Sequence, residues 1–112
     1  KPGDQATAAS QLRNASVRTV QFLTGLCLLD SASNAVQIDV VPFEVTFRRL
    51  SDAQIERYLR RETPYNCAGS FRSEALGIAL FEKMHGDDPN ALIGLPLIRL
   101  ISMLEHAGYP II

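Results

Sequence analysis

Two long strand-like segments decide the fold that this sequence predicts. Residues 17–48 read VRTVQFLTGLCLLDSASNAVQIDVVPFEVTFR. In residues 17–30, apolar side chains of one parity predict a strand, and a second apolar set of the other parity predicts that both faces are covered. The first set is Val20, Phe22, Leu26 and Leu28, and the second is Leu23, Cys27 and Leu29. Residues 31–35 are small and polar, which is typical of a hairpin connection.

The second segment, residues 36–48, contains a change of phase. Its apolar residues stand at even positions first and at odd positions afterwards. Because a strand cannot exchange its faces without an extra residue, we expect a bulge or bend near Val41 and Pro42. Pro42 also has no N–H to donate to a neighbouring strand. The even set is Val36, Ile38 and Val40, and the odd set is Phe43, Val45 and Phe47.

Capping signals predict helices before and after these strands. Asp4 suits the N-cap of a helix over residues 4–15. Ser51 and Gln54 form a capping box, which predicts a second helix that begins at Asp52. This helix ends before Pro64, because the residue that precedes a proline avoids helical angles.

Three arginines lie in the last turn of the second predicted helix: Arg57, Arg60 and Arg61. They could bind an anion. They also complement the helix dipole and keep one face solvated. Of the two interpretations, the sequence favours the dipole and the solvated face over an anion site.

The remaining chain predicts a third strand and a last helix. Residues 76–84 alternate as a strand, and residues 86–89 form a turn that includes Asp87 and Asp88. Apolar residues then recur at helical spacing over residues 97–104, with Pro96 in the first turn and Gly108 at the C-cap. The order of elements is that of an α/β or α+β layered domain with helices against a curved sheet.

Composition restricts the class of protein. The 112 residues are 46% apolar and 21% charged, which is ordinary for one globular domain. Eleven Lys and Arg against twelve Asp and Glu give no global signal for nucleic acid or for an anionic membrane surface. No apolar run reaches the roughly 20 residues that a membrane helix needs, and no secretory signal is visible. We expect Cys27 and Cys67 to be free thiols, and their spacing does not suggest zinc.

Residues 64–78, PYNCAGSFRSEALGI, are the candidate ligand-binding segment. Small residues surround Arg72 and Glu74 there. Such residues let the backbone approach a ligand closely, and N–H groups in a loop of this kind can hold anionic oxygens. A tight crossover with a local Arg72–Glu74 pair would have the same composition, so the pattern alone does not choose between them.

The sequence resembles the Maf-like nucleoside triphosphate pyrophosphatases, and most closely their 7-methyl-GTP-hydrolysing branch. The resemblance covers essentially the whole chain. It rests on five blocks: KP at residues 1–2, FLTGL at 22–26, PFEVTFR at 42–48, CAGSFRSE at 67–74 and LIGLPL at 92–97. The fourth and fifth blocks together, in this order and at this separation, are specific.

The resemblance implies a cytosolic enzyme that splits a nucleoside triphosphate into its monophosphate and diphosphate. Members have an elongated α/β fold, a mixed sheet flanked by helices, and are commonly homodimers. They use a divalent cation, Mg²⁺ or Mn²⁺, which we expect to be held mainly by substrate phosphates and by residues outside this chain. Neither nucleic acid nor a membrane is an expected partner.

The resemblance also assigns site residues. Lys1 matches the lysine of the Gly-Lys-Pro motif in the active site, and is the catalytic candidate of this chain. Glu74 matches a position that helps to set base preference, where the sister branch acting on dTTP and UTP has glutamine. Ser70, Phe71 and Arg72 belong to the same block, and we expect them to contact or shape the substrate site.

The family's N-terminal motifs do not occur here. The Ser-x-x-Arg-Arg phosphate loop and the catalytic aspartate of Gly-Ser-Asp-Gln would lie upstream of Lys1. We therefore expect residues 1–112 to be the C-terminal portion of a Maf-like domain, whose intact form hydrolyses 7-methyl-GTP. The alternatives are a broader or pyrimidine specificity, or an inactive binding or dimerisation fragment.

Overall fold

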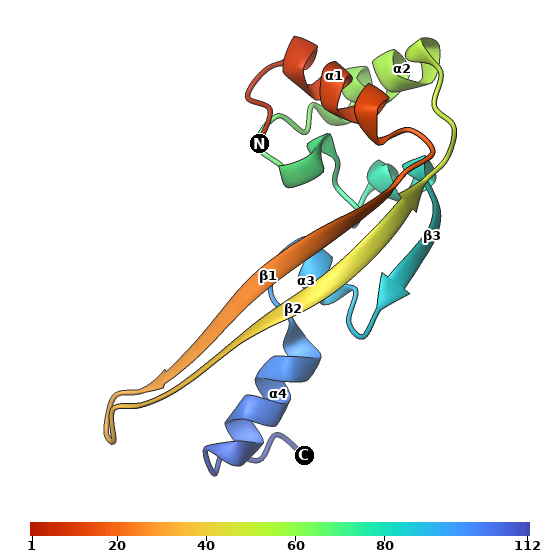
Figure 1. Ribbon diagram of the computed structural model, residues 1–112. Coiled ribbons are helices and arrows are strands. Elements are labelled where there is room, and N and C mark those ends of the chain that lie inside the picture. The colour runs from red at the N-terminus through yellow and green to blue at the C-terminus, as the bar shows by residue number, and fades with distance from the viewer. The chain divides into compact units, whose positions relative to one another are not determined.

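The computed structural model describes residues 1–112 and has the mixed α/β architecture that the sequence predicts (Figure 1). Three strands form one antiparallel sheet in the order β1-β2-β3. No helix has both the length and the apolar character needed to cross a membrane. The elements in chain order are α1 (Gln5–Ala15), β1 (Thr19–Asp30), β2 (Ala35–Phe47), α2 (Asp52–Glu62), two short 3₁₀ segments (Ala68–Ser70 and Leu76–Leu80), β3 (Phe81–Gly86), α3 (Asn90–Ile93) and α4 (Leu97–His106).

The chain divides into two compact units, and all three strands run from one into the other. The first unit contains residues 1–20 and 44–84, and the second contains residues 21–43 and 85–112. The candidate segment, residues 64–78, belongs entirely to the first unit.

Local capping signals place the two helices of the first unit. Asp4 caps α1, with its Oδ1 accepting the Thr7 N–H at 2.8 Å. Ser51 and Gln54 form the predicted capping box of α2, which ends before Pro64 as expected. The helices contact each other, and the fully buried apolar side chains of this unit include Leu12, Ile55 and Leu59.

Three phenylalanines from different segments complete the core of the first unit. Phe47 ends β2, Phe81 begins β3 and Phe71 comes from the candidate segment. Each pair packs edge to face, with ring centroids 4.9–5.7 Å apart. The candidate segment is therefore anchored to the sheet through Phe71.

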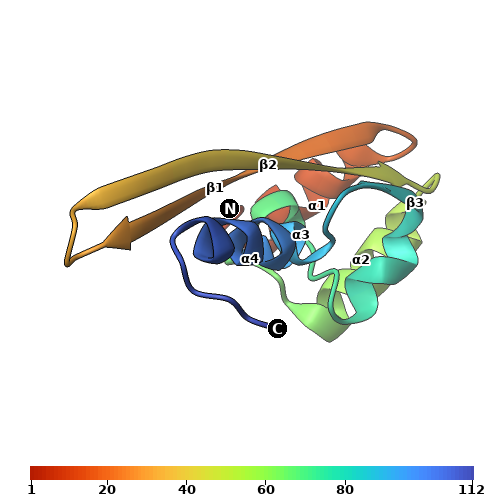
Figure 2. The same ribbon diagram turned by 90° about the horizontal axis from the view of Figure 1, so that it is seen from below.

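In the second unit, α4 lies along the inner side of the β1–β2 hairpin (Figure 2). Gln37 Nε2 donates to the Met103 carbonyl at 2.8 Å, and Asp39 forms an ion pair with Arg99. Thr24 Oγ1 donates to the Ala91 carbonyl at 2.8 Å. Polar side chains on the inner face of the hairpin therefore bind α3 and α4.

The predicted bulge near Val41 and Pro42 is wrong. Burial along β2 alternates without a break, and odd-numbered residues face inward from Gln37 to Phe47. The prediction from the pattern was wrong because the polar residues Gln37 and Asp39 face inward, where they bind residues of α4. The apolar residues next to them in β2 therefore face outward.

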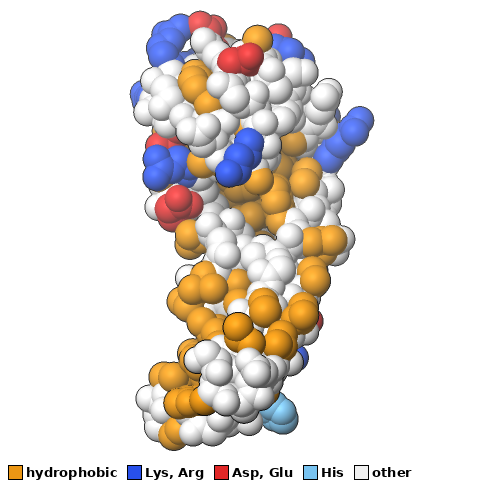
Figure 3. All heavy atoms as spheres, turned by 90° about the vertical axis from the view of Figure 1, so that its left-hand side faces the viewer, with side chains coloured by type: hydrophobic (Ala, Val, Ile, Leu, Met, Phe, Trp, Pro, Cys, Tyr) orange, Lys and Arg blue, Asp and Glu red, His pale blue; other side chains and the backbone are white.

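The prediction that both faces of the first strand are covered is also wrong. The outward residues of the hairpin leave an apolar face at the surface (Figure 3). The exposed fractions are 64% for Leu23, 59% for Leu29, 51% for Val36, 75% for Ile38 and 53% for Val40. Cys27 on the same face is an exposed free thiol, and Cys67 is a free thiol that is partly buried.

The chain after residue 75 differs from the prediction in two ways. The predicted strand over residues 76–84 begins later, because residues 76–80 form a 3₁₀ segment and β3 starts at Phe81. The turn after Gly86 leads into a short helix, α3, that the sequence did not predict. Pro96 directly precedes α4, and Gly108 follows it with a positive φ of 92°.

Candidate functional site

The candidate segment connects α2 to β3 and is tied to α2 by two side chains. The Tyr58 hydroxyl accepts the Arg72 N–H at 3.0 Å, and Glu62 Oε1 accepts the Leu76 N–H at 2.7 Å. Tyr58 and Glu62 are four residues apart and share one face of the helix. The sequence analysis missed this role, because only the path of the segment brings its backbone to these side chains.

Burial keeps the Tyr58 phenol protonated. Burial raises the pKa of Tyr58 to about 12, and the hydrogen bond from the Arg72 N–H opposes part of this rise. The hydroxyl therefore holds its proton at neutral pH while it accepts the backbone N–H. It acts as a neutral anchor for the segment.

The backbone of the segment makes a close turn at Gly77. The Arg72 carbonyl accepts the N–H groups of Gly77 at 3.0 Å and Ala75 at 3.2 Å. A Cβ on residue 77 would lie 2.3 Å from the Arg72 carbonyl oxygen, so only glycine fits. Gly69 and Ser70 both have positive φ, at 77° and 64°. The residues between these turns are therefore held in a defined path.

Ser70 and Phe71 point into the protein. Ser70 is fully buried, and its hydroxyl is hydrogen bonded to Gln11 Oε1 of α1. Phe71 is 4% exposed and belongs to the aromatic core. In this structure both side chains fix the segment, and their contact with a substrate remains a prediction.

Arg72 and Glu74 point to solvent. The side chains are 49% and 41% exposed, and Arg72 Nε lies 3.7 Å from Glu74 Oε1. An exposed pair at this distance is weak, typically between zero and about 1 kcal/mol. Both groups are therefore available to a ligand at little cost.

Lys1 lies on the same unit as the candidate segment. The Gly3 N–H donates to the Tyr65 carbonyl at 2.8 Å, and Pro2 is buried. This contact fixes residues 1–3 beside the start of the segment, while Lys1 itself is exposed. The chain end that carries Lys1 therefore lies beside Tyr65, and the catalytic role of Lys1 remains a prediction.

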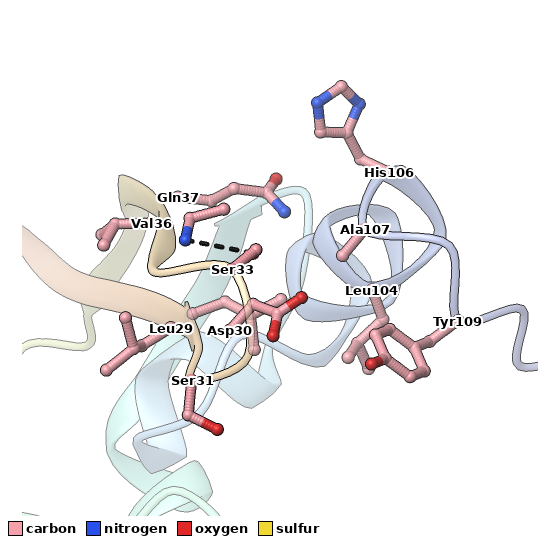
Figure 4. A pocket seen from close by; sticks show the side chains of 12 residues that line it. Leu29, Asp30, Ser31, Ser33, Val36, Gln37, Leu104, His106, Ala107 and Tyr109 are labelled. Carbon is pink, nitrogen blue, oxygen red and sulfur yellow. Dashed lines mark hydrogen bonds between the residues drawn. The ribbon is translucent and has the colours of Figure 1, made fainter.

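The predicted site residues line neither of two hollows of the structure. The larger, about 510 Å³, lies in the second unit between the hairpin end and the end of α4 (Figure 4). Two of its polar side chains bind the turn of the hairpin, since Ser33 Oγ accepts the Ala35 N–H and Asp30 accepts the Ala32 N–H. The His106 ring points away from the other labelled side chains (Figure 4). The geometry therefore does not indicate a catalytic site there.

The smaller hollow, about 200 Å³, lies in the first unit between α2 and residues 76–80. Its lining contains three arginines and no acidic residue. It borders the candidate segment from the side of Tyr58. The arginines are Arg48, Arg57 and Arg61.

No group of three or more His, Cys, Asp or Glu side chains is placed to hold a metal ion. The residues of this chain therefore do not form a site for the divalent cation that the resemblance implies.

Comparison with known proteins defines the class. The family model for Maf-like protein matches residues 1–107, and the chain therefore belongs to the Maf-like protein family. This confirms the resemblance found in the sequence. The 7-methyl-GTP pyrophosphatase of Nitrosococcus oceani is 57% identical over 112 residues, and that of Cupriavidus metallidurans is 56% identical over 110 residues. These matches cover 100% and 98% of this chain but 56% and 55% of the relatives, so the chain spans about half their length.

Proposed function

We propose that the full-length protein containing residues 1–112 hydrolyses 7-methyl-GTP to 7-methyl-GMP and diphosphate. In this reaction a water oxygen bonds to the α-phosphorus, the bond from that phosphorus to the α–β bridging oxygen breaks, and diphosphate leaves. The observation that carries the proposal is 57% identity, over the whole chain, to a relative named for this activity. The protein would be a hydrolase of a nucleoside triphosphate and would work in the cytoplasm.

We propose that the Glu74 carboxylate contacts the base of the substrate and selects guanine. The Watson–Crick edge of guanine presents two donors, N1–H and N2–H, and a carboxylate can accept both. Methylation at N7 adds positive charge to the ring system, which a carboxylate attracts and a neutral amide does not. The exposure of Glu74 and its loose contact with Arg72 support this role, because little would be lost when the carboxylate turns to a ligand.

Lys1 and Arg72 are the cations proposed for the phosphates. Hydrolysis at phosphorus builds negative charge on the phosphate oxygens, so nearby cations lower the barrier. The contact between Gly3 and Tyr65 supports the pairing, since it keeps residue 1 beside the segment of Arg72. Ser70 and Phe71 would act by holding that segment in place.

Other parts of the machinery belong outside these residues. We propose that Mg²⁺ or Mn²⁺ is held mainly by the substrate phosphates and by groups that this chain does not supply.

We propose a homodimer of the full-length protein. The exposed apolar face of β1 and β2, which includes Leu23, Ile38 and Val40, supports a surface of this kind. Sedimentation of the full-length protein tests it, and a monomer at micromolar concentration would contradict it.

The proposed role of Glu74 is tested with Glu74→Gln in the full-length protein. An amide offers one acceptor and one donor group, which suits the edge of uracil rather than that of guanine. We expect the ratio of kcat/KM for 7-methyl-GTP to that for UTP to fall by about ten- to a hundred-fold, since a charge-assisted hydrogen bond is worth about 1.5–3 kcal/mol.

The matched control is Glu105→Gln, an exposed carboxylate of α4 with no hydrogen bond or ion pair, which should leave the ratio unchanged. An equal loss on both substrates in Glu74→Gln would contradict base selection and would make Glu74 catalytic or structural.

A further inference from the structure

Three arginines of the first unit share one hollow and have no acidic partner. Four other basic residues are paired with carboxylates: Arg13 with Asp52, Arg60 with Glu56, Arg72 with Glu74 and Arg99 with Asp39. Arg48, Arg57 and Arg61 form no such pair, and all three line the hollow of about 200 Å³.

Helix α2 and the end of β2 place the three arginines at this hollow. Arg57 and Arg61 are four residues apart on α2, so they lie on one face of the helix. Arg48 follows β2, and its Nε donates to the Ala79 carbonyl at 3.1 Å, which fixes its guanidinium beside the hollow. The two Nη groups of Arg48 remain available. Arg60, which stands between the two helical positions, turns instead to Glu56.

The rest of the lining favours an anion. Gln54 uses its Oε1 in the capping box and keeps its amide N–H groups available at the same hollow. Leu50, Leu76 and Leu80 supply the apolar part of the lining. Three like charges around one hollow repel one another, and an anion with two or more charges would relieve this repulsion.

We propose that Arg48, Arg57 and Arg61 form a binding site for a small, multiply charged phosphate anion of the size of inorganic diphosphate. Guanidinium groups match phosphate oxygens in geometry and charge. The hollow has room for such an anion. The site is separate from Lys1 and Glu74, which do not line it, and the proposal does not depend on the nucleotide specificity proposed above.

The site borders the candidate segment through two contacts. The ring of Tyr58 lines the hollow while its hydroxyl holds the Arg72 N–H, and residues 76–80 form the opposite wall. An anion bound there would thus stabilise the backbone on either side of Glu74.

The test is calorimetric titration of sodium diphosphate into the 112-residue chain at 0.1 M salt, where exposed charges more than about 10 Å apart are largely screened. The variants are Arg61→Gln and Arg60→Gln, which remove one charge each from neighbouring positions of one helix. We expect Arg61→Gln to weaken binding about tenfold, as the loss of a charge-assisted hydrogen bond would. Arg60→Gln should change it less than about twofold, because that side chain does not line the hollow.

Equal weakening by both variants, or no binding by the wild-type chain, would overturn the proposal. Amide chemical shifts of the wild-type chain give a second measurement that needs no variant. Shifts on adding diphosphate should concentrate at residues 76–80 and in α2. Shifts confined to residues 1–3 and 70–75 would place the anion at the nucleotide site and would overturn the proposal as well.

Discussion

Asp88 joins two helices of the second unit through one carboxylate. Its Oδ1 accepts the Asn90 N–H at 2.9 Å and the Asn90 side-chain amide at 2.8 Å, and its Oδ2 accepts the Ile98 N–H at 2.8 Å. The residue is 1% exposed. The sequence suggested only a turn at this position, because the N–H of Ile98 is ten residues away and belongs to another helix. Burial raises the pKa of Asp88, but the hydrogen bonds from Ile98 and Asn90 outweigh it and leave the pKa below its usual value of 3.8.

Asp88→Asn should lower the free energy of unfolding by about 1–3 kcal/mol at pH 7, since an amide cannot accept all three bonds and leaves a buried N–H unpaired. The lowered pKa sets the sign of the pH dependence. The unfolded chain binds the proton more tightly, so this stabilisation is present above about pH 4 and is lost as the pH falls through the folded value. Urea unfolding at pH 7 and pH 3 measures both effects.

The control for this residue is Asp87→Asn, a change at the exposed neighbour, which makes no hydrogen bond. It should leave stability at pH 7 within about 0.5 kcal/mol of the wild type. A difference between Asp88→Asn and the wild type that stays constant from pH 7 to pH 3 would show that the carboxylate charge has no part in holding α3 and α4.

At the scale of elements, the sequence predicted the helix starts correctly, because capping bonds between near neighbours in the chain decide them. Asp4 and Ser51 cap helices by bonds to residues three positions on, and such bonds depend on nothing distant. The faces of β2 were predicted wrongly because Gln37 and Asp39 are satisfied by Met103 and Arg99. These partners lie 60 or more positions along the chain, and no pattern within the strand indicates them.

The candidate segment depends on its glycine at residue 77. In Gly77→Ala the added Cβ would meet the Arg72 carbonyl oxygen at 2.3 Å, and backbone atoms cannot move aside as a side-chain end can. We expect a loss of about 1–3 kcal/mol in stability, as for other overpacked sites, and displacement of residues 72–77. Thermal unfolding and the amide spectrum of the segment measure the two effects.

Gly25→Ala is the matched control, because a Cβ at that position meets nothing within 4 Å. Residue 25 is an exposed position of β1, so this change should be neutral or slightly stabilising. Similar Tm values for the two variants would contradict the close turn at Gly77.

At the scale of the whole molecule, the sequence located the candidate segment but not its supports. Composition singled out residues 64–78, and the structure shows Arg72 and Glu74 at its surface and Gly3 hydrogen bonded to Tyr65 at its start. The anchors Tyr58 and Glu62 and the arginine-lined hollow could not be predicted, since they depend on how α2 meets residues 72–80 in space. The chain spans 56% of the length of the Nitrosococcus oceani relative.

The central claim, cleavage of 7-methyl-GTP between its α- and β-phosphates, is tested most directly by product analysis in ¹⁸O-labelled water. The full-length protein is incubated with 7-methyl-GTP and Mg²⁺ or Mn²⁺, and the 112-residue chain alone, for which we expect no turnover, is the control. The account predicts equal amounts of 7-methyl-GMP and diphosphate, with the label in the 7-methyl-GMP. Release of 7-methyl-GDP and phosphate, label in the diphosphate, or no turnover by the full-length protein would contradict it.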